Sequence, residues 1–346
     1  RRDGLAGVHP YFYPPPFLLG APIAHVPLTT AYRVWFWLDL VLSVVSVAFL
    51  AAAWGRGRPA VPWLLAIAFG GATAVANNHG MGQMNVLTLA LVAGGLAADE
   101  RDRQGLAGVL LGVACMAKMS PAFFVAWWML RGRYKAVGAA VLTGVVLSVA
   151  AFAVVPWSVQ WHFYTGVLPG FGSGDYNGLS VPIGLFGNHA LADLYNILLP
   201  GDGRTLSPVA RLLSTATLVG VLAVMGVAFR GPSDAVARSG QAAAVAVAML
   251  IVPVYTYEHH LVWALPAAVV VVDAALSGRL GKGWLVLALA CFFVVAFDLE
   301  TLRALARAAG DPWTRVLAES KLWALIGLFA ASLRLGASYA RRPEGT

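Results

Sequence analysis

Charged side chains are scarce in this chain of 346 residues, which is 59% hydrophobic and only 12% charged. A soluble domain carries about 25% charged residues. This chain has about half that fraction and also contains long apolar runs, which indicates that lipid is the main solvent of this protein. The composition therefore excludes a soluble enzyme or a soluble binding module.

Cysteine and clustered basic charge are also scarce. The cysteines are Cys115 and Cys291, both within apolar runs, so we interpret them as packing residues and expect no disulfide framework and no metal motif. The net charge of +8 is spread over short loops without a contiguous basic stripe, which argues against nucleic acid as a partner. No internal repeat is evident, so an inverted-repeat transporter is not favoured.

The apolar runs predict an all-α bundle that crosses the membrane many times. A helix needs about 20 apolar residues to cross a bilayer, and the segments 105–118 and 121–130 are too short for two crossings. Pro121 breaks the helix between them. We therefore expect about nine full spans plus this pair of half-length helices, whose junction is buried in protein or faces water. The expected segments are 34–54, 61–77, 83–98, 105–118, 121–130, 136–155, 209–229, 240–254, 261–277, 284–298 and 320–338.

Lysine and arginine occupy alternate short loops, and this alternation predicts the orientation. Short loops on the cytoplasmic side are enriched in these residues, whereas the opposite loops at 77–82 and 255–260 carry none. We therefore expect a bacterial plasma membrane protein whose polar span ends at 77–82 and 255–260 lie outside the cell. The basic loop residues are Arg56, Arg58, Arg101, Arg103, Arg131, Arg133, Lys135, Arg230, Arg238, Arg279, Lys282, Arg341 and Arg342.

The outer loop 156–208 is too long for a simple connector, so we treat it as a functional subregion of one transmembrane domain that covers residues 1–346. It is rich in aromatic residues, which favour the headgroup level of a membrane. Leu191, Leu194 and Leu198 fall on one helical face, which predicts a helix lying in the interface. Three polar residues of the loop are candidates for contact with an acceptor, with ordinary solvated loop polarity as the alternative: Asp175, Asn177 and Ser180.

Amides and an imidazole gather where one expected span ends and the next begins. Asn78 and His79 end one span, Gln83 and Asn85 open the next, and the link Gly80–Gly82 holds the two ends together. These groups can hydrogen-bond sugar hydroxyls or a phosphate. Helix capping and inter-helix hydrogen bonds are the alternative, but they account for one or two such residues rather than for the whole group.

A carboxylate stands beside two imidazoles at a second span end, in Glu258, His259 and His260. Together they offer a general base and donors for a phosphate. Adjacent residues of a helix point about 100° apart, so only one of the two histidines is expected to face a shared cavity. The spacing does not match a zinc-binding helix, and a solvated interfacial cluster is the alternative.

Single residues add to these two clusters. Lys118 lies at the expected helix break, where an ammonium is costly unless it is paired or faces water; it can bind a phosphate as a point charge, and snorkelling is the alternative. Tyr13 precedes the rigid approach Pro14–Pro16 and is a candidate to face the cavity. Asp39 lies inside the first expected span, and we interpret it as a paired structural carboxylate.

Several short motifs follow one another in a fixed order along the chain. They are Phe12–Pro16 before a span, Gly82–Asn85 at the start of another, Lys118–Pro121 after Leu106–Gly112, and His259–Trp263. Together they resemble glycosyltransferase family 87, the DUF2029 group of GT-C fold membrane enzymes, which includes polyprenol-phosphate-mannose-dependent mannosyltransferases. Residues 177–180 resemble the family's Asn-Gln-Ser-Leu segment, with departures. The resemblance covers residues 10–266.

The resemblance implies a helical bundle of GT-C type that moves a hexose, with mannose expected, from a polyprenyl phosphate donor on the outer side of the membrane. It also implies an inverting mechanism in which a carboxylate deprotonates the acceptor hydroxyl and the lipid phosphate leaves. We expect no cofactor and no metal besides the lipid-linked donor. The residues expected to bind the donor and its phosphate are Lys118, Gln83, Asn85, His79, Asn78 and Tyr13.

Two departures from the family concern the base. In the family a catalytic aspartate lies in the first outer loop, well before the Tyr-Pro-Pro motif, whereas here only twelve residues precede Tyr13, and Asp3 is the one acid among them. The chain also begins at Arg1 without an initiator methionine, so we expect an upstream segment that holds the base. Within the chain the catalytic candidates are Glu258, which stands where relatives often have aspartate, His260 and His259.

The sequence therefore predicts an inverting hexosyltransferase whose partners are a polyprenyl phosphate sugar, a lipid or glycan acceptor and membrane lipids. A transporter or flippase for a lipid-linked or amphipathic anion is the main alternative, because the same cationic and amide groups would bind cargo without chemistry. A non-catalytic assembly subunit is the second alternative. It requires the polar clusters to pair with each other and to leave no cavity.

Overall fold

Every regular element that the structure describes is helical, which confirms the all-α prediction. The computed structural model describes residues 13–175, 187–202, 205–297, 308 and 312–337, and no strand occurs within these ranges. The long helices are α1 (Leu28–Trp54), α2 (Ala60–Gly71), α3 (Thr73–Gly80), α4 (Asn85–Asp99), α5 (Gln104–Ala117), α6 (Ala122–Leu130), α7 (Tyr134–Ala150), α11 (Pro208–Ala228), α12 (Ala235–Ile251), α13 (Ala264–Leu276), α14 (Lys282–Ala296) and α17 (Ser320–Gly336). The short helices are η1 (Pro15–His25), η2 (Ala151–Ala153), α8 (Trp157–His162), η3 (Phe163–Val167), α9 (Leu168–Gly170), η4 (Phe171–Ser173), α10 (Leu191–Leu198), η5 (Glu258–Trp263) and α16 (Pro312–Ala318).

Fewer helices are long enough to cross a membrane than the sequence predicted. In the described chain, four are both long and apolar enough, at Leu28–Trp54, Tyr134–Ala153, Pro208–Ala228 and Glu258–Leu276. The pair α2 and α3 adds a fifth candidate that is bent by 55°, at a residue, Ala72, with extended backbone angles. Other apolar helices, such as α4 and α5, have 15 and 14 residues and are therefore only about 21–23 Å long, less than the roughly 30 Å of a hydrocarbon core. The nine expected full crossings are thus not all present as full-length helices.

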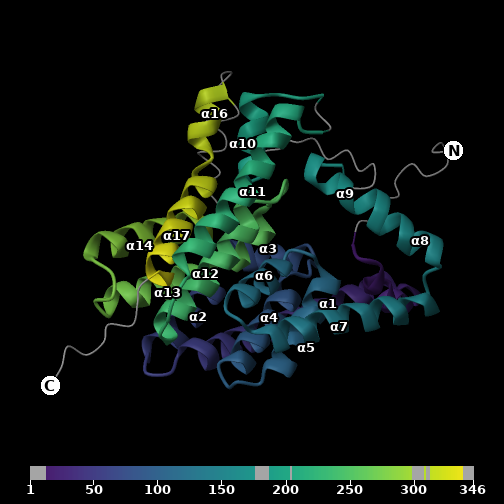
Figure 1. Cartoon of the computed structure of the whole chain (residues 1–346), viewed down its shortest axis with the longest axis horizontal. Coiled ribbons are helices and arrows are strands. Elements are labelled where there is room, and N and C mark those ends of the chain that lie inside the picture. The colour runs from purple at the N-terminus through teal and green to yellow at the C-terminus, as the bar shows by residue number, and fades with distance from the viewer. Residues whose placement is uncertain (1–12, 176–186, 203–204, 298–307, 309–311, 338–346) are drawn as a thin grey trace.

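Two groups of helices make up the bundle (Figure 1). In one group α4 packs against α1 and α5, and α5 packs against α7; in the other α12 and α14 pack against α13 and α17. The two glycines Gly108 and Gly112 let α5 and α7 approach closely, because a Cβ at Gly108 would lie 2.1 Å from the Ala136 carbonyl oxygen. Helix α13 is buried continuously from Ala264 to Ala274, so it forms the centre of the bundle.

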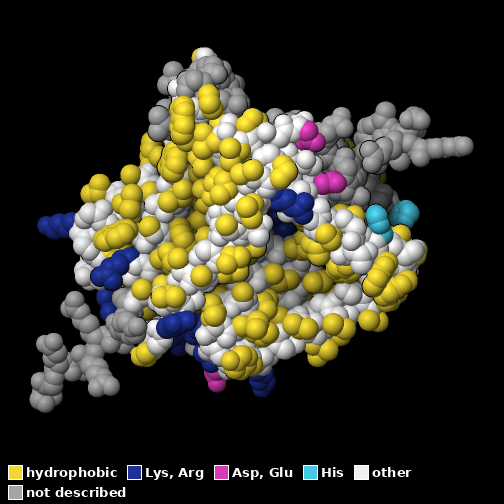
Figure 2. Space-filling model, turned by 45° about the horizontal axis from the view of Figure 1, so that its top comes forward, with side chains coloured by type: hydrophobic (Ala, Val, Ile, Leu, Met, Phe, Trp, Pro, Cys, Tyr) yellow, Lys and Arg dark blue, Asp and Glu magenta, His cyan; other side chains and the backbone are white. Residues whose placement is uncertain are grey.

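Apolar side chains cover much of the outer surface, as lipid exposure requires. Figure 2 shows hydrophobic side chains spread over the whole visible face of the molecule. On α1, Trp37 and Val44 are about two-thirds exposed, and on α7 the side chains of Leu142 and Val149 are also exposed. These two helices are candidate spans that bury less than a third of their apolar window within the chain, so they present an apolar face outward.

Ion pairs gather the basic loops at one end of the bundle. Each pair joins two segments that are far apart in the sequence, which brings the α1–α2, α4–α5, α6–α7, α11–α12 and α13–α14 connections together. The pairs are Arg58 with Asp273, Arg131 and Arg133 with Asp99, Arg238 with Glu100, and Arg279 with Asp234. The loops that the charge pattern placed on one side therefore do lie together in space.

The expected outer loop carries several short helices, of which α8 and α9 project away from the bundle (Figure 1). The helix predicted from Leu191, Leu194 and Leu198 is present as α10. Its buried face holds Ala192, Asp193 and Asn196, whereas the three leucines are half-buried. The candidate acceptor residues Asn177 and Ser180 fall outside the described residues.

Candidate functional site

A chain of hydrogen bonds joins polar residues from four helices, and we name these four residues the Lys118 network. The Asn78 amide nitrogen donates to Asp39 Oδ2 at 2.7 Å. The Asn85 amide nitrogen donates to Asn78 Oδ1 at 3.1 Å, and Lys118 Nζ donates to Asn85 Oδ1 at 2.6 Å. The turn between α3 and α4 makes this possible: Gly82, with a φ of +61°, folds the chain so that Asn78 and Asn85 face each other.

The two amides of this network are fully used inside the protein. Asn78 also donates to the carbonyl oxygen of Gln83, and Asn85 also donates to the carbonyl oxygen of His259, each at 3.1 Å. Because carboxylate and carbonyl oxygens only accept, each amide must present its own oxygen in the other direction. Asn85 is therefore fixed with its oxygen toward Lys118. Asn78 and Asn85 are at most 1% exposed, so in this structure they position Lys118 instead of presenting their amides to an open cavity.

Lys118 is the cationic end of the network. It caps α5 in an extended conformation, the chain breaks as predicted before α6 begins at Ala122, and the side chain is half-buried. Its bond to Asn85 uses one of three ammonium protons, and the described residues contain no ion-pair partner for it. Lys118 also lies close enough to His259 and His260 to interact with both electrostatically. An ammonium held in this way can still donate to an anion.

Asp39 and His79 form the buried end of the site. Asp39 is fully buried and, as expected from the sequence, is paired: besides Asn78, His79 Nε2 lies 3.4 Å from its carboxylate. His79 Nε2 is nearer to Ser43 Oγ, at 3.0 Å, and Ser43 in turn donates to the Asp39 carbonyl. A carboxylate within a span is costly unless it is hydrogen-bonded, and these contacts satisfy Asp39 Oδ2, whereas Oδ1 is buried without a hydrogen-bond partner.

Glu258 belongs to a second cluster that the sequence did not reveal, the His189 cluster of His189, Glu258, Glu319 and Lys321. His189 Nε2 lies 3.1 Å from Glu258 Oε1, and Lys321 Nζ donates to Glu258 Oε2. His189 Nδ1 lies 3.4 Å from Glu319 Oε2. Each carboxylate oxygen of Glu258 therefore has a cationic or imidazole partner, and one such contact uses only one of the lone pairs of the oxygen. The sequence analysis did not consider Lys321, an ionisable residue in the last apolar helix, and it is the sequence signal that could have indicated this cluster.

The two histidines of η5 differ in their contacts. His260 Nδ1 accepts a hydrogen bond from the backbone N–H of Tyr257 at 3.1 Å, so its neutral ring carries the proton on Nε2. His259 is buried and supplies its carbonyl oxygen to Asn85. The rings are 4.4 Å apart, edge to face. Tyr257, whose ring is tilted against both histidine rings with centroids 6.0 Å away, has its pKa raised to about 12 by burial, so its hydroxyl stays protonated.

The remaining predicted residues lie around the network. Tyr13 is half-buried, 5.2 Å from the ring of Phe17, at the start of the segment that packs on α5 and α7. Gln83 is half-buried in the α3–α4 turn, and Asp175 is exposed at the end of the described outer segment. Their predicted contacts with donor or acceptor stay predictions. Among the described residues no group of three His, Cys, Asp or Glu side chains is placed to hold a metal ion.

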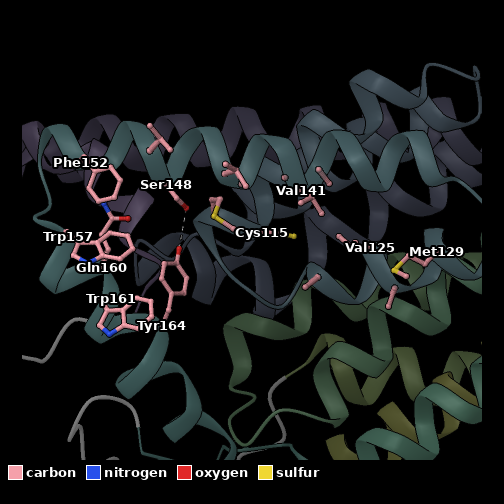
Figure 3. A pocket seen from close by; sticks show the side chains of 18 residues that line it. Cys115, Val125, Met129, Val141, Ser148, Phe152, Trp157, Gln160, Trp161 and Tyr164 are labelled. Carbon is pink, nitrogen blue, oxygen red and sulfur yellow. Dashed lines mark hydrogen bonds between the residues drawn. The ribbon is translucent and has the colours of Figure 1, made fainter.

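An apolar groove of about 770 Å³ lies between α5, α6, α7 and α8 (Figure 3). Met116 and Ala122, which flank the break at Lys118, both line it. At the far end the rings of Trp157 and Trp161 are stacked 5.6 Å apart, and α8 and η3 bring Gln160 and Tyr164 beside them (Figure 3). The groove is apolar, and Asp39, Asn78, Asn85 and Lys118 do not line it. The polar residues pair with each other, so the assembly-subunit alternative stays open.

Comparison with known proteins agrees with the motifs. Residues 11–253 match glycosyltransferase family 87. The chain belongs to this family. Over 281 residues it is 28% identical to a Mycobacterium tuberculosis polyprenol-phosphate-mannose-dependent alpha-(1-2)-phosphatidylinositol mannoside mannosyltransferase (strain ATCC 25618 / H37Rv), with 76% of this chain and 62% of the relative covered. Over 294 residues it is 28% identical to the protein of the same description from Mycolicibacterium smegmatis (strain ATCC 700084 / mc(2)155), with 80% and 64% covered.

The chain spans less than two thirds of the length of these two family 87 relatives. No solved structure matches it. The matched residues 11–253 contain the whole Lys118 network and most of the apolar groove, whereas Glu258 and η5 follow directly after them. The resemblance over residues 10–266 that the sequence indicated is confirmed as family membership.

Proposed function

We propose that this family 87 protein transfers mannose from a polyprenyl phosphate donor to a lipid or glycan acceptor on the outer face of a bacterial plasma membrane. The names of the two relatives support polyprenyl phosphate mannose as the donor and suggest a phosphatidylinositol mannoside as the acceptor. Within the structure, the observation that carries the proposal is Lys118, a half-buried ammonium at a helix break beside an apolar groove. A lipid phosphate needs both features.

In this proposal Lys118 binds the phosphate that joins the mannose to the lipid. An ammonium makes charge-assisted hydrogen bonds to phosphate oxygens, and these strengthen as negative charge develops on the leaving phosphate. Asn85 holds the Lys118 side chain by its Nζ, so the charge is in place before the donor arrives. His259 and His260 lie within electrostatic reach of the same ammonium and are the further candidates to contact the phosphate.

The apolar groove is proposed to hold the polyprenyl chain. It is bounded by α5, α6, α7 and α8, and Met116 and Ala122, on either side of the helix break, belong to its lining. A chain that leaves the phosphate at Lys118 can therefore enter the groove directly. Each buried CH₂ contributes about 0.8 kcal/mol, so even part of a polyprenyl chain supplies several kcal/mol of binding free energy.

The proposed reaction is a single displacement at the sugar carbon that bears the phosphate. The acceptor oxygen forms a bond to this carbon, the bond from the carbon to the phosphate oxygen breaks, and the electron pair leaves with the lipid phosphate. The acceptor proton passes to a general base. No cofactor besides the donor enters the proposal. Of the candidates within the chain, His260 has Nδ1 occupied, and Glu258 is paired with His189 and Lys321.

The test uses the native membrane protein in proteoliposomes with radiolabelled polyprenyl phosphate mannose and phosphatidylinositol mannoside. We expect label to appear in the acceptor lipid with the wild type and to fall at least tenfold with Lys118→Met. Arg101→Met, which changes a basic residue at the other end of the bundle, is the matched control and should leave transfer intact. Movement of the labelled donor across the bilayer without transfer would replace the proposal with the flippase alternative.

A further inference from the structure

His189 sits between two carboxylates in a part of the molecule that the proposed reaction does not use directly. Its Nε2 faces Glu258 at 3.1 Å and its Nδ1 faces Glu319 at 3.4 Å. The residue is only 3% exposed. The ring therefore has a carboxylate at both nitrogens and little access to water.

This arrangement requires one more proton than a neutral histidine supplies. A neutral imidazole has one N–H and one lone pair, and a carboxylate can only accept. One of the two contacts would then set a lone pair against a carboxylate oxygen in a buried place. Imidazole, with an ordinary pKa of about 6.5, is a stronger base than a glutamate carboxylate at about 4.3, so the extra proton belongs on the ring.

We propose that His189 is held as an imidazolium in the folded protein and acts as a positioning residue, joining the end of the outer loop to η5 and α17. With His189 protonated, its charge and that of Lys321 balance Glu258 and Glu319. The cluster is then neutral as a whole. Burial of this kind is tolerated when every charge has a partner.

Hydrogen bonds fix the main chain at His189, so the residue itself stays beside the two carboxylates when the ring loses the proton. The His189 N–H donates to the Thr256 carbonyl at 2.7 Å, and the Thr256 N–H donates to Asn188 Oδ1 at 2.8 Å. Asn188 Nδ2 also donates to the Val254 carbonyl. Deprotonation therefore leaves a lone pair facing a carboxylate, and the junction between the outer loop and η5 is weakened.

Four charged or titratable groups face His189 in the described chain. Glu258 and His260 come from η5, and Glu319 and Lys321 come from the start of α17. Lys321 opposes a charge on His189, and His260 is neutral because its Nδ1 accepts from the Tyr257 N–H, whereas the two carboxylates are in direct contact with the His189 ring. The folded chain thus keeps a proton that the unfolded chain loses near pH 6.5. The proton on His189 therefore stabilises the folded state fully below that pH, and this stabilisation is lost as the pH rises further.

The test compares thermal unfolding midpoints of the purified protein in detergent at pH 6 and pH 9. We expect the wild-type Tm to fall by about 2–4 °C more than that of His189→Gln over this interval. Glu319→Gln is the decisive variant, because a glutamine N–H can donate to the lone pair of neutral His189, which removes the need for the proton. At pH 6 the Tm of Glu319→Gln should be near the wild-type value. Between pH 6 and pH 9 its Tm should fall only as much as that of His189→Gln. His162→Gln, an exposed histidine outside the cluster, is the control and should keep the wild-type pH dependence.

The proposal is overturned if Glu319→Gln retains the wild-type fall in Tm, even where His189→Gln fails to fold. The consequence for catalysis rests on the proposed function: mannose transfer by Glu319→Gln should persist at pH 9 where wild-type transfer declines. If the wild type transfers no mannose at any pH but the expected Tm difference between the wild type and Glu319→Gln is observed, only the proposed function is overturned. Equal Tm profiles with active transfer would overturn only the role of His189.

Discussion

At the scale of single residues, Lys118 differs from a snorkelling lysine because a fixed acceptor, Asn85, holds its ammonium inside the protein. Replacing Asn85 with aspartate keeps the size of the side chain but places a carboxylate against the ammonium. The resulting ion pair competes with any phosphate, so we expect affinity for polyprenyl phosphate to fall at least tenfold, or about 1.4 kcal/mol. Binding to the protein in nanodiscs measures this.

Thr88→Val supplies the control for that change. Thr88 is fully buried on the same helix, and its hydroxyl donates to the Met84 and Asn85 carbonyls without touching Lys118. The affinity of the Thr88→Val variant for polyprenyl phosphate should stay within twofold of the wild-type affinity. If Asn85→Asp binds the lipid as tightly as Thr88→Val does, Lys118 is not the phosphate ligand.

The sequence allowed some of these residues to be predicted and not others. Lys118 and Asn85 stood out because charged or amide side chains are rare within apolar runs. Their hydrogen bond could not be foreseen, because it depends on how α5 packs beside α4. The partners of Glu258 were missed for the same reason: His189 and Lys321 are 69 and 63 positions away from it, and only the tertiary fold brings them together.

At the scale of helices, the contact between α5 and α7 depends on glycine. A Cβ at Gly108 would lie 2.1 Å from the Ala136 carbonyl oxygen and 2.6 Å from the Ala139 Cβ, both on α7. We expect Gly108→Ala to lower the free energy of unfolding by about 2–3 kcal/mol, as overpacking does. Gly138→Ala, on α7 with open space around the new methyl group, should be neutral or stabilising by about 0.5–1 kcal/mol. Thermal unfolding in detergent distinguishes the two, and equal midpoints would show that the helices can separate at no cost.

Helix positions were predicted well from the sequence because apolar runs and loop charges mark them directly. The expected break before α6 is present because Pro121 cannot continue a helix. The bend between α2 and α3 was missed: no proline lies at Ala72, and the run 61–77 is apolar almost throughout. The expected number of full crossings is not confirmed, since an apolar run shows that a helix is buried, in protein or in lipid, without showing which.

At the scale of the whole molecule, α4 connects the two ends of the bundle. Its first residue, Asn85, belongs to the Lys118 network, and its last residue, Asp99, pairs with Arg131 and Arg133 at the basic end. Fifteen residues of helix place these ends about 22 Å apart. The positive-inside rule predicts that the basic end lies in the cytoplasm and that the network faces the opposite side of the membrane.

This orientation predicts which positions a membrane-impermeant maleimide can reach in intact spheroplasts. Met81 is 60% exposed in the turn beside the network, and Arg56 is exposed in a basic loop. In a background with Cys115 and Cys291 replaced by alanine, Met81→Cys should be labelled from outside, whereas Arg56→Cys should be labelled only after the membrane is opened. The reverse pattern would put the network in the cytoplasm, where an outer-face acceptor could not reach it. Each variant controls for the expression and folding of the other. A difference in labelling between Met81→Cys and Arg56→Cys in intact spheroplasts therefore shows on which side of the membrane the donor phosphate must be presented.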